Sequence, residues 1–137
     1  MIDVVLDTNI LVSALWSKDS NPDKIAHLIP DGKIIPCFCE EILSEYKLVL
    51  SRPAFCFTAV KVDELLMNLV KHGKTVVAYR SCIPLPDEDD RVFYDTAKES
   101  GAILITGNTK HYPTEPFIMT PAGFLSAYEN ELCLKKV

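Results

Sequence analysis

Residues 2–6 form a short, strongly apolar run that stops abruptly at residues 7–9, Asp-Thr-Asn. The run is rich in Ile and Val, which is typical of a buried β-strand. Apolar residues resume over residues 10–16, densely enough to predict a helix. An aspartate therefore stands between a strand and a helix, and in open α/β sheets ligands bind beyond the carboxyl ends of the strands. The same three residues could instead serve only as a helix cap, so polar positions further along decide between the two interpretations.

Predicted strands and helices alternate along the rest of the chain. The predicted strands cover residues 2–6, 33–38, 75–79, 102–106 and 117–119, and the predicted helices cover residues 10–16, 22–30, 39–51, 62–72, 89 or 90 to 100, and 121–130. Asn21 is the expected N-cap of the second helix, and Pro36 suggests that the second strand lies at an edge or ends there. The alternation predicts an α/β fold, with a parallel sheet and helices on both faces. At 137 residues the chain is expected to form a single domain, 1–137.

Three further polar residues stand where their side chains could reach the same end of the sheet as Asp7. Glu45 interrupts the apolar face of the third predicted helix, three residues after Ile42, and Asp90 begins the fifth. Asn108 follows the fourth predicted strand. If that strand lies beside the first one, Asp7 and Asn108 emerge side by side at the switch point of the sheet. The helices that carry Glu45 and Asp90 can then close the same pocket.

Three carboxylates in one pocket repel one another, and a bound cation relieves that repulsion. Oxygen ligands without histidine or thiolate indicate Mg²⁺ or Mn²⁺ rather than zinc. Such a site suits phosphodiester hydrolysis, because the cation lowers the pKa of water and stabilises the charge that develops on the phosphate.

At these positions the sequence resembles the PIN-domain family, the nuclease fold of VapC-like toxins of bacterial toxin–antitoxin systems. Four segments carry the resemblance in the family's order: Asp7-Thr8-Asn9-Ile10, the helix segment Glu45-Tyr46 to Val49-Leu50, the acidic run at residues 87–93, and Thr106-Gly107-Asn108. The spacing of 18 residues between Asp90 and Asn108 favours Asp90 over Asp87 and Asp89 as the third acid.

The resemblance implies a three-layer α/β/α sandwich and Mg²⁺- or Mn²⁺-dependent cleavage of single-stranded RNA. It also implies a cognate antitoxin and frequent homodimers. By this likeness Asp7, Glu45 and Asp90 are the expected catalytic residues and metal ligands, assisted by Asn108. The family has an aspartate where this chain has Asn108, which removes one negative charge. We therefore expect one tightly held ion and a weaker second ion that the RNA phosphate recruits.

Other polar residues have supporting roles or none. Thr8, Asn9 and Thr106 are expected to orient Asp7 or to cap the helix. Candidate phosphate contacts are Lys110, His111, Arg80 and Arg91, for which exposure on a solvated loop is the alternative. We expect Asp87 and Asp89 to be a solvated helix entry, and Asp95 to lie on the surface because it points about 140° away from Asp90 around the helix. Trp16, Tyr46 and Phe93 are expected in the core rather than as base-stacking platforms.

Composition narrows the remaining possibilities. The net charge of −5 argues against a broad basic face for nucleic acids. Five scattered cysteines fit reduced thiols in a cytoplasmic protein better than a zinc site. No apolar run approaches the roughly 18 residues that span a bilayer, so no membrane association is expected.

Three rival functions remain. The first is an inactive PIN-like module that only binds a partner protein, which Asn108 favours. The second is a receiver-like phosphoacceptor domain, which needs an aspartate after the middle strand, and residues 79–82 contain none. The third is a haloacid-dehalogenase-type phosphatase, which needs an aspartate at the position of Asn9.

Overall fold

The computed structural model describes residues 2–135, and side chains to residue 131. The strands are β1 (Ile2–Leu6), β2 (Ile34–Phe38), β3 (Lys74–Thr75), β4 (Ile103–Ile105) and β5 (Ile118–Met119). The helices are α1 (Thr8–Trp16), α2 (Asn21–His27), α3 (Glu40–Leu50), α4 (Ala59–His72), α5 (Arg91–Ser100) and α6 (Pro121–Lys135). Three 3₁₀ turns lie at Pro53–Phe55, Glu88–Asp90 and Thr109–His111.

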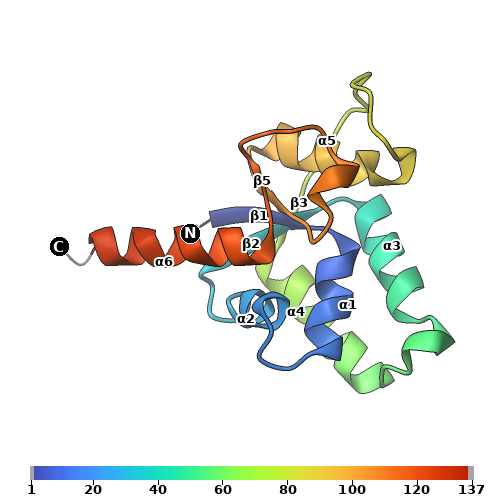
Figure 1. The fold of residues 1–137 in the computed structure, drawn as a ribbon. Helices are drawn as coiled ribbons and strands as arrows, with labels where there is room; N and C mark the ends of the chain where they lie inside the picture. Colours follow the sequence, from blue (N-terminus) through green and yellow to red (C-terminus); the bar gives the residue numbers. More distant parts are fainter. Residues whose placement is uncertain (1, 136–137) are drawn as a thin grey trace.

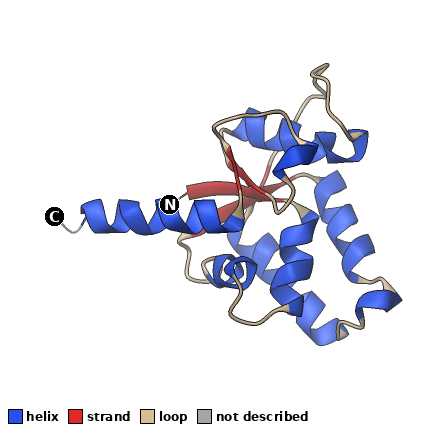
Figure 2. Cartoon of the chain, viewed as in Figure 1, coloured by secondary structure: helices blue, strands red, loops and turns tan. Residues whose placement is uncertain are grey.

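The strands form one sheet in the order β3-β2-β1-β4-β5, and every pairing is parallel (Figure 2). β1 lies at the centre, where Leu6 pairs with Ile105 of β4. The predicted parallel sheet is confirmed. The first and fourth strands are neighbours, which is the condition on which the expected placement of Asp7 beside Asn108 depends. The chain runs outward from β1 in both directions, so the loops after β1 and β4 meet at the switch point.

Helices cover both faces of the sheet, which gives a three-layer α/β/α arrangement. Figure 1 shows α5 on one side of the sheet and α1, α2 and α4 on the other. α6 contacts α2 and extends outward from the body of the domain. α5 contacts β1, β2 and β4, and α3 reaches α5 past the carboxyl ends of the strands. The residues before α3 and α5 therefore lie on either side of the switch point.

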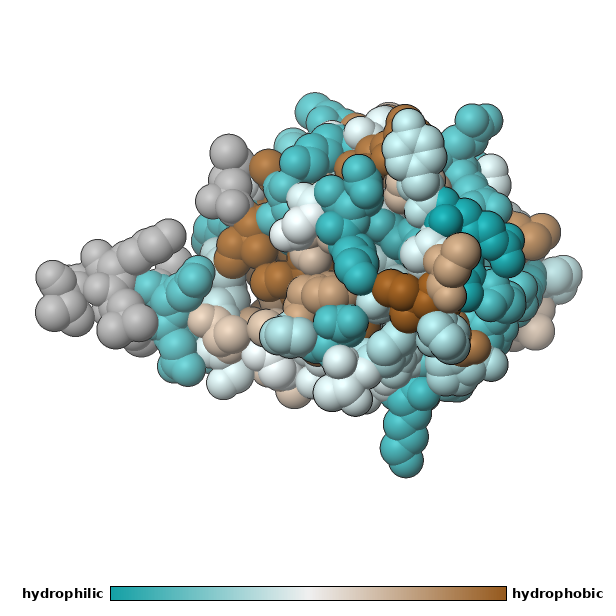
Figure 3. Space-filling model, turned by 90° about the horizontal axis from the view of Figure 1, so that it is seen from above, coloured by the Kyte–Doolittle hydropathy of each residue, from teal (hydrophilic) through white to brown (hydrophobic). Residues whose placement is uncertain are grey.

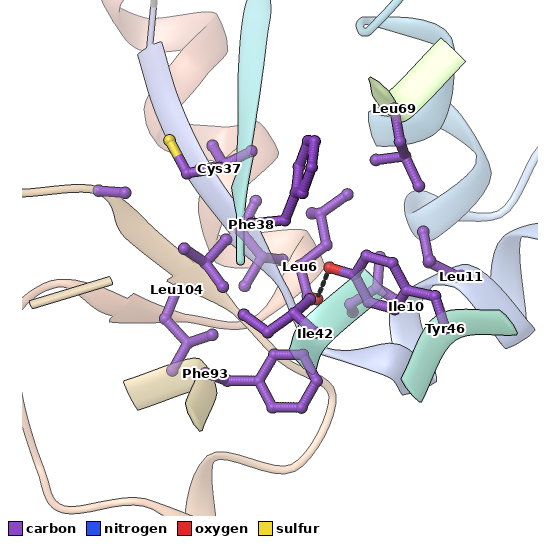
Figure 4. Packing of buried hydrophobic residues seen from close by; sticks show 14 of the residues in the cluster. Leu6, Ile10, Leu11, Cys37, Phe38, Ile42, Tyr46, Leu69, Phe93 and Leu104 are labelled. Atoms are coloured by element: carbon purple, nitrogen blue, oxygen red, sulfur yellow. Dashed lines mark hydrogen bonds between the residues drawn. The ribbon is translucent and has the colours of Figure 1, made fainter. Parts of the chain in front are cut away.

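The core forms where the central strands meet the helices (Figure 4). Val4, Val5 and Leu6 of β1 are fully buried or nearly so, which explains the unbroken apolar run of this strand. Tyr46 of α3 donates a hydrogen bond of 2.5 Å from its hydroxyl to the carbonyl oxygen of Leu6. This bond fixes α3 against the end of β1, next to the predicted site. Tyr46 and Phe93 are core residues as predicted.

Trp16 was predicted to lie in the core, and this is wrong. Its side chain is 63% exposed because α1 ends at this residue, beyond the part of the helix that packs on the sheet. Val70 of α4, an apolar residue of the predicted helix at residues 62–72, is also exposed. An apolar residue at the end of a helix, or at the margin of its apolar stripe, satisfies the sequence pattern without being covered.

Several element boundaries differ from the prediction. The predicted strand at residues 75–79 is only β3, because the segment after Thr75 leaves the sheet and exposes Val77 and Tyr79. Ser20, not Asn21, caps α2, since its hydroxyl accepts a hydrogen bond from the Asp23 amide. β2 is not the edge strand, although β3 pairs only with its last two residues and so leaves Pro36 without a strand on its outer side.

Hydrophilic residues cover much of the face seen from the α5 side, with hydrophobic residues in separate patches between them (Figure 3). Within residues 2–135, no helix combines the length and apolar character that crossing a membrane requires.

Candidate active site

Asp7 lies at the carboxyl end of β1, beside the end of β4. Its backbone amide donates to the carbonyl oxygen of Ile105 at 3.0 Å, which extends the pairing of the two strands by one residue. The side chain is buried, at 7% exposure, and makes no capping hydrogen bond to α1. The interpretation of Asp7 as a simple helix cap is therefore wrong.

Two hydroxyl groups hold the Asp7 carboxylate from one side. Thr106 Oγ1 and the Tyr112 hydroxyl both donate to Oδ2, at 2.9 and 2.8 Å. Among the residues that the structure describes, no hydrogen bond goes to Oδ1. One carboxylate oxygen is thus fixed within the protein and the other is left for a ligand. Burial, together with the negative charge of Asp7, raises the pKa of Tyr112 far above its ordinary range, so this phenol remains a donor.

Glu45 approaches from α3 and is half-buried. Its Oε2 accepts a hydrogen bond of 2.7 Å from Thr8 Oγ1, at the first residue of α1. Thr8 therefore orients Glu45, rather than Asp7 as the sequence suggested. Burial raises the pKa of Glu45, the Thr8 hydrogen bond opposes this, and the charges of Asp7 and Asp89 add to the rise.

Asp90 ends the 3₁₀ turn before α5, and its side chain is only 16% exposed. Its Oδ2 atom is buried and accepts no hydrogen bond in the described part of the chain. His111 Nδ1 lies 3.3 Å from this oxygen without the geometry of a hydrogen bond. Burial, reinforced mainly by the charges of Asp7 and Asp87, raises the pKa of Asp90 from 3.8 to about 6.

The three carboxylates lie within electrostatic range of one another, because the charges of Asp7 and Glu45 both raise the pKa of Asp90. Their side chains are not drawn together: within the described residues, no three His, Cys, Asp or Glu side chains form a group that could hold a metal ion. The chemistry of the donors nevertheless fits a divalent cation, since they are hard oxygen ligands and one of them is a buried oxygen without a partner.

Thr106, at the start of the turn after β4, is fully buried and takes part in three hydrogen bonds through its hydroxyl. Its Oγ1, which donates to Asp7, accepts hydrogen bonds from the Asn108 backbone amide at 3.0 Å and from Asn9 Nδ2 at 3.5 Å. Asn9 Oδ1 also accepts from the Gly107 amide at 3.1 Å. Asn9 therefore braces the β4 turn instead of touching Asp7. Asn108 is exposed, and its side chain makes no hydrogen bond among the described residues.

A cleft of about 530 Å³ extends from Glu45 between α3, α5 and the loop at residues 76–87. Arg80 lies on this cleft, exposed and paired with Glu88 at 3.1 Å. Lys110 and His111 stand in the 3₁₀ turn after Asn108, with Lys110 exposed and His111 half-exposed beside Asp90. Arg80, Lys110 and His111 thus border the region of the carboxylates.

Arg91 and Asp95 anchor the loop that walls this cleft. The Arg91 guanidinium is buried and donates to Glu88 and to the carbonyl oxygens of Ser81 and Ile83, so it is engaged within the protein rather than facing a phosphate. Asp95 accepts hydrogen bonds from the Ser81 amide and hydroxyl. The expectation that Asp95 lies on the surface is wrong, because the loop covers that side of α5.

Tyr112 is the site residue that the sequence interpretation missed. It stands in a loop, and only its position shortly after the end of β4 hinted that it could reach Asp7.

We predict that Tyr112→Phe weakens Mn²⁺ binding about tenfold, as is typical when a hydrogen bond that orients a metal-binding side chain is lost. Isothermal titration calorimetry measures this directly. Tyr94→Phe is the matched control, because that hydroxyl donates to Glu115 instead, and equal Mn²⁺ affinity of the two variants would contradict the orienting role of Tyr112.

The ionised Asp90 carboxylate should lower the free energy of unfolding of the metal-free protein. The unfolded chain ionises this carboxyl near pH 3.8 and the folded chain near pH 6, so the cost is absent below pH 3.8 and complete above pH 6. We predict that Asp90→Asn raises the free energy of unfolding by about 1–3 kcal/mol at pH 7.5 in EDTA, and by little at pH 4. Urea denaturation at both pH values tests this, and an unstabilised variant at pH 7.5 would refute it.

Comparison with known proteins agrees with this geometry. The family described as PIN domain matches residues 3–110, which include Asp7, Glu45, Asp90 and Asn108. The chain is also similar to an uncharacterized protein of Methanocaldococcus jannaschii. The two are 33% identical over 117 residues, which cover 78% of this chain and 71% of the relative.

Proposed function

This chain belongs to the PIN-domain family, and on that premise we propose that it is a metal-dependent endoribonuclease acting on single-stranded RNA. PIN domains are generally nucleases that bind divalent metals. The observation that carries the proposal is the buried Oδ2 of Asp90, which has no hydrogen-bond partner among the described residues and lies within electrostatic range of Asp7 and Glu45. A carboxylate left this way costs folding free energy, and a cation that it binds compensates for that cost.

In this proposal Asp7, Glu45 and Asp90 hold Mg²⁺ or Mn²⁺, and Asn108 assists from the turn after β4. When bound, such a cation lowers the pKa of water and stabilises the charge that develops on the phosphate. Thr106 and Tyr112 keep one oxygen of Asp7 turned toward the site, and Thr8 does the same for Glu45. These hydroxyls therefore set the direction of the ligands before substrate arrives.

The RNA would meet the basic side chains around the carboxylates. In this proposal the exposed Lys110 and Arg80 bind RNA phosphates near the scissile bond. His111, half-exposed beside Asp90, would donate a proton to the leaving oxygen. Arg91 is left out of this set, since its guanidinium already holds the loop at residues 76–87.

We further propose that the enzyme acts in the cytoplasm as the toxin of a toxin–antitoxin pair, with a cognate antitoxin protein as its partner. Induced expression of the wild-type chain should then arrest growth, whereas a variant without the Asp7 carboxylate should not. A short reading frame beside the gene that encodes a neutralising protein would identify the antitoxin.

The second candidate function is an inactive module that acts only through protein binding. Two observations favour it: the three carboxylates are not drawn into a ready metal cluster, and Asn108 lacks the fourth charge. Calorimetric titration with Mn²⁺ separates the candidates. A nuclease site binds the ion in the micromolar to low millimolar range, whereas a degenerate site gives no heat of binding.

The decisive test is degradation of single-stranded RNA by the purified chain, with Mn²⁺ and with EDTA. The proposal expects internal cleavage that requires the metal, releases 5′ and 3′ fragments, and disappears in EDTA. Cleavage that persists in EDTA would contradict the proposed metal dependence. Absence of cleavage together with absence of Mn²⁺ binding would reject the nuclease proposal.

A further inference from the structure

Three aromatic rings gather at the end of α1 that lies farthest from Asp7. Trp16 is 63% exposed, and its ring meets Phe55 and Phe57 edge-on, with centroids 5.5 and 6.2 Å away. Phe55 and Phe57 stack on each other at 5.4 Å. We call Trp16, Phe55 and Phe57 the aromatic platform. Figure 1 shows the end of α1 beside the segment that joins α3 to α4, from which the two phenylalanines come.

Backbone conformation and ring contacts fix the geometry of the aromatic platform. Cys56, between the two phenylalanines, takes a left-handed backbone conformation with φ of 54°, which is uncommon for a residue other than glycine. The Phe55 and Phe57 rings lie nearly parallel, at 17°, and Phe57 is anchored on the hydrophobic core. The two edge-on contacts hold the Trp16 ring in place although most of its surface is open to solvent. A rigid, exposed indole loses little entropy when a flat ligand stacks on it.

The charges around the platform suit a nucleic acid strand. Lys18 stands two residues after Trp16, next to Asp19, and Arg52 stands three residues before Phe55. Both cations are exposed, and neither forms an ion pair within the described residues. A hollow of about 280 Å³ beside Phe57 is lined by Arg52 and Asp63. A guanidinium and a carboxylate together match the edge of a base, which carries both acceptors and donors. A purely aliphatic partner surface would offer no polar or charged groups to pair with these side chains.

The platform also lies within reach of the proposed cleavage centre. Thr8, which holds Glu45, is the first residue of α1, and Trp16 is the last, so about 12 Å of helix separates them at 1.5 Å per residue. A short single strand leading away from the cleaved bond can span that distance.

We propose that the aromatic platform is a base-stacking subsite, where bases of a single-stranded RNA stack on Trp16 while Lys18 and Arg52 contact its phosphates. This inference rests on the proposed ribonuclease function and extends it to how the substrate is held. Stacking on an aromatic ring is tolerant of sequence, because every base has a flat face. The subsite therefore selects unpaired strands over duplexes rather than one sequence over another.

Trp16 is the single tryptophan of the chain, so its fluorescence reports directly on the platform. The full chain in EDTA, where no cleavage occurs, is titrated with a short unstructured RNA, with the same RNA annealed to its complement, and with inorganic polyphosphate. The expected result is saturable quenching by the single strand, with little change for the duplex or polyphosphate. Equal quenching by polyphosphate would show that charge alone is sensed, and would overturn stacking.

Variants separate stacking from general loss of structure. Trp16→Ala should weaken binding of a labelled single strand about tenfold, as expected for losing one stacked base, and Trp16→Phe should restore most of it. Leu48→Ala is the matched control, because Leu48 is equally exposed on α3 but outside the platform. In Mn²⁺, Trp16→Ala should raise KM for long RNA and leave kcat near that of the wild type.

The outcomes also separate this inference from the proposed function. Mn²⁺-dependent cleavage with unchanged RNA affinity in Trp16→Ala would overturn the subsite and leave the nuclease intact. RNA-induced quenching without cleavage would support the subsite while the nuclease proposal fails. If the fluorescence changes with protein concentration in the absence of RNA, a second copy of the chain covers Trp16, and the subsite is overturned.

Discussion

Replacing Asp7 with asparagine should lower the rate of RNA cleavage by about a thousandfold or more, the scale seen when a group that stabilises transition-state charge is removed. Asp7 is the most deeply buried of the three carboxylates and the one fixed by two hydroxyl donors. Single-turnover cleavage of RNA in Mn²⁺ measures the rate, and calorimetry should show that Mn²⁺ binding is lost as well.

The same substitution should leave the fold intact. The asparagine oxygen can take the place of Oδ2 and accept hydrogen bonds from Thr106 and Tyr112, so that its amide group takes the place of Oδ1. A neutral donor there removes the repulsion that raises the pKa of both carboxyls. We therefore expect the melting temperature of the metal-free variant to equal or exceed that of the wild type in EDTA.

Asp3→Asn is the matched control for this experiment. Asp3 lies on the same strand but pairs with Lys74 at 2.6 Å, far from the carboxylate region. Its loss should leave cleavage near the wild-type rate. Full activity of Asp7→Asn would reject the site, and a variant that loses activity only because it unfolds would show a lowered melting temperature in EDTA.

The position of Asp7 was predictable because it depends on local pattern. A buried parallel strand needs a continuous apolar run, and the first polar residue after that run must emerge at the carboxyl edge of the sheet. The same reasoning placed Asn108 after β4. The pairing of β1 with β4 brings the two loops together, as the prediction required.

The partners of the site residues were not predictable, because they depend on how the elements pack. Thr8 reaches Glu45 only because α1 and α3 lie side by side. Asp95 points away from Asp90 on the helix, as its spacing requires, but residues 76–87 fold over that side and bury it against Ser81. Helical periodicity gives the direction of a side chain and leaves open what lies there.

Trp16 illustrates the same limit for apolar residues. The pattern of residues 10–16 indicates a helix with much of its surface covered, and every residue of that helix before Trp16 is buried or half-buried. The pattern does not reveal that the side chain of Trp16, the last residue of the helix, is left mostly exposed. Exposure of a large aromatic residue at that point is what turns an expected core residue into a candidate contact for RNA.

Gly73 should be the glycine least tolerant of substitution. It joins α4 to β3, and a Cβ there would overlap the carbonyl oxygens of Leu69 and Pro36 and lie 2.8 Å from Phe38 Cε1. Its backbone is extended on the negative-φ side, so the constraint is space and not conformation. Since two of the obstructing atoms belong to the backbone, α4 and β2 would have to separate to admit a methyl group.

We predict that Gly73→Ala lowers the free energy of unfolding by about 3 kcal/mol, at the upper end of what overpacking costs. Gly101→Ala is the matched control: it has open space around the new methyl group but a φ of +69°, so we expect a cost of about 1 kcal/mol. Urea denaturation compares the two variants. A Gly73→Ala cost no larger than that of Gly101→Ala would contradict the close approach.

Gly73→Ala should also loosen the loop at residues 76–87, which forms one wall of the cleft. Directly after β3, the Val76 amide donates to the carbonyl oxygen of Phe38 at 2.8 Å, and from there residues 76–87 cross to the cleft wall that Ser81 fastens to α5. Forcing α4 away from β2 displaces the start of that segment. We therefore expect Gly73→Ala, still folded at low temperature, to be cut faster by protease within residues 76–87, whereas Gly101→Ala is cut at the wild-type rate.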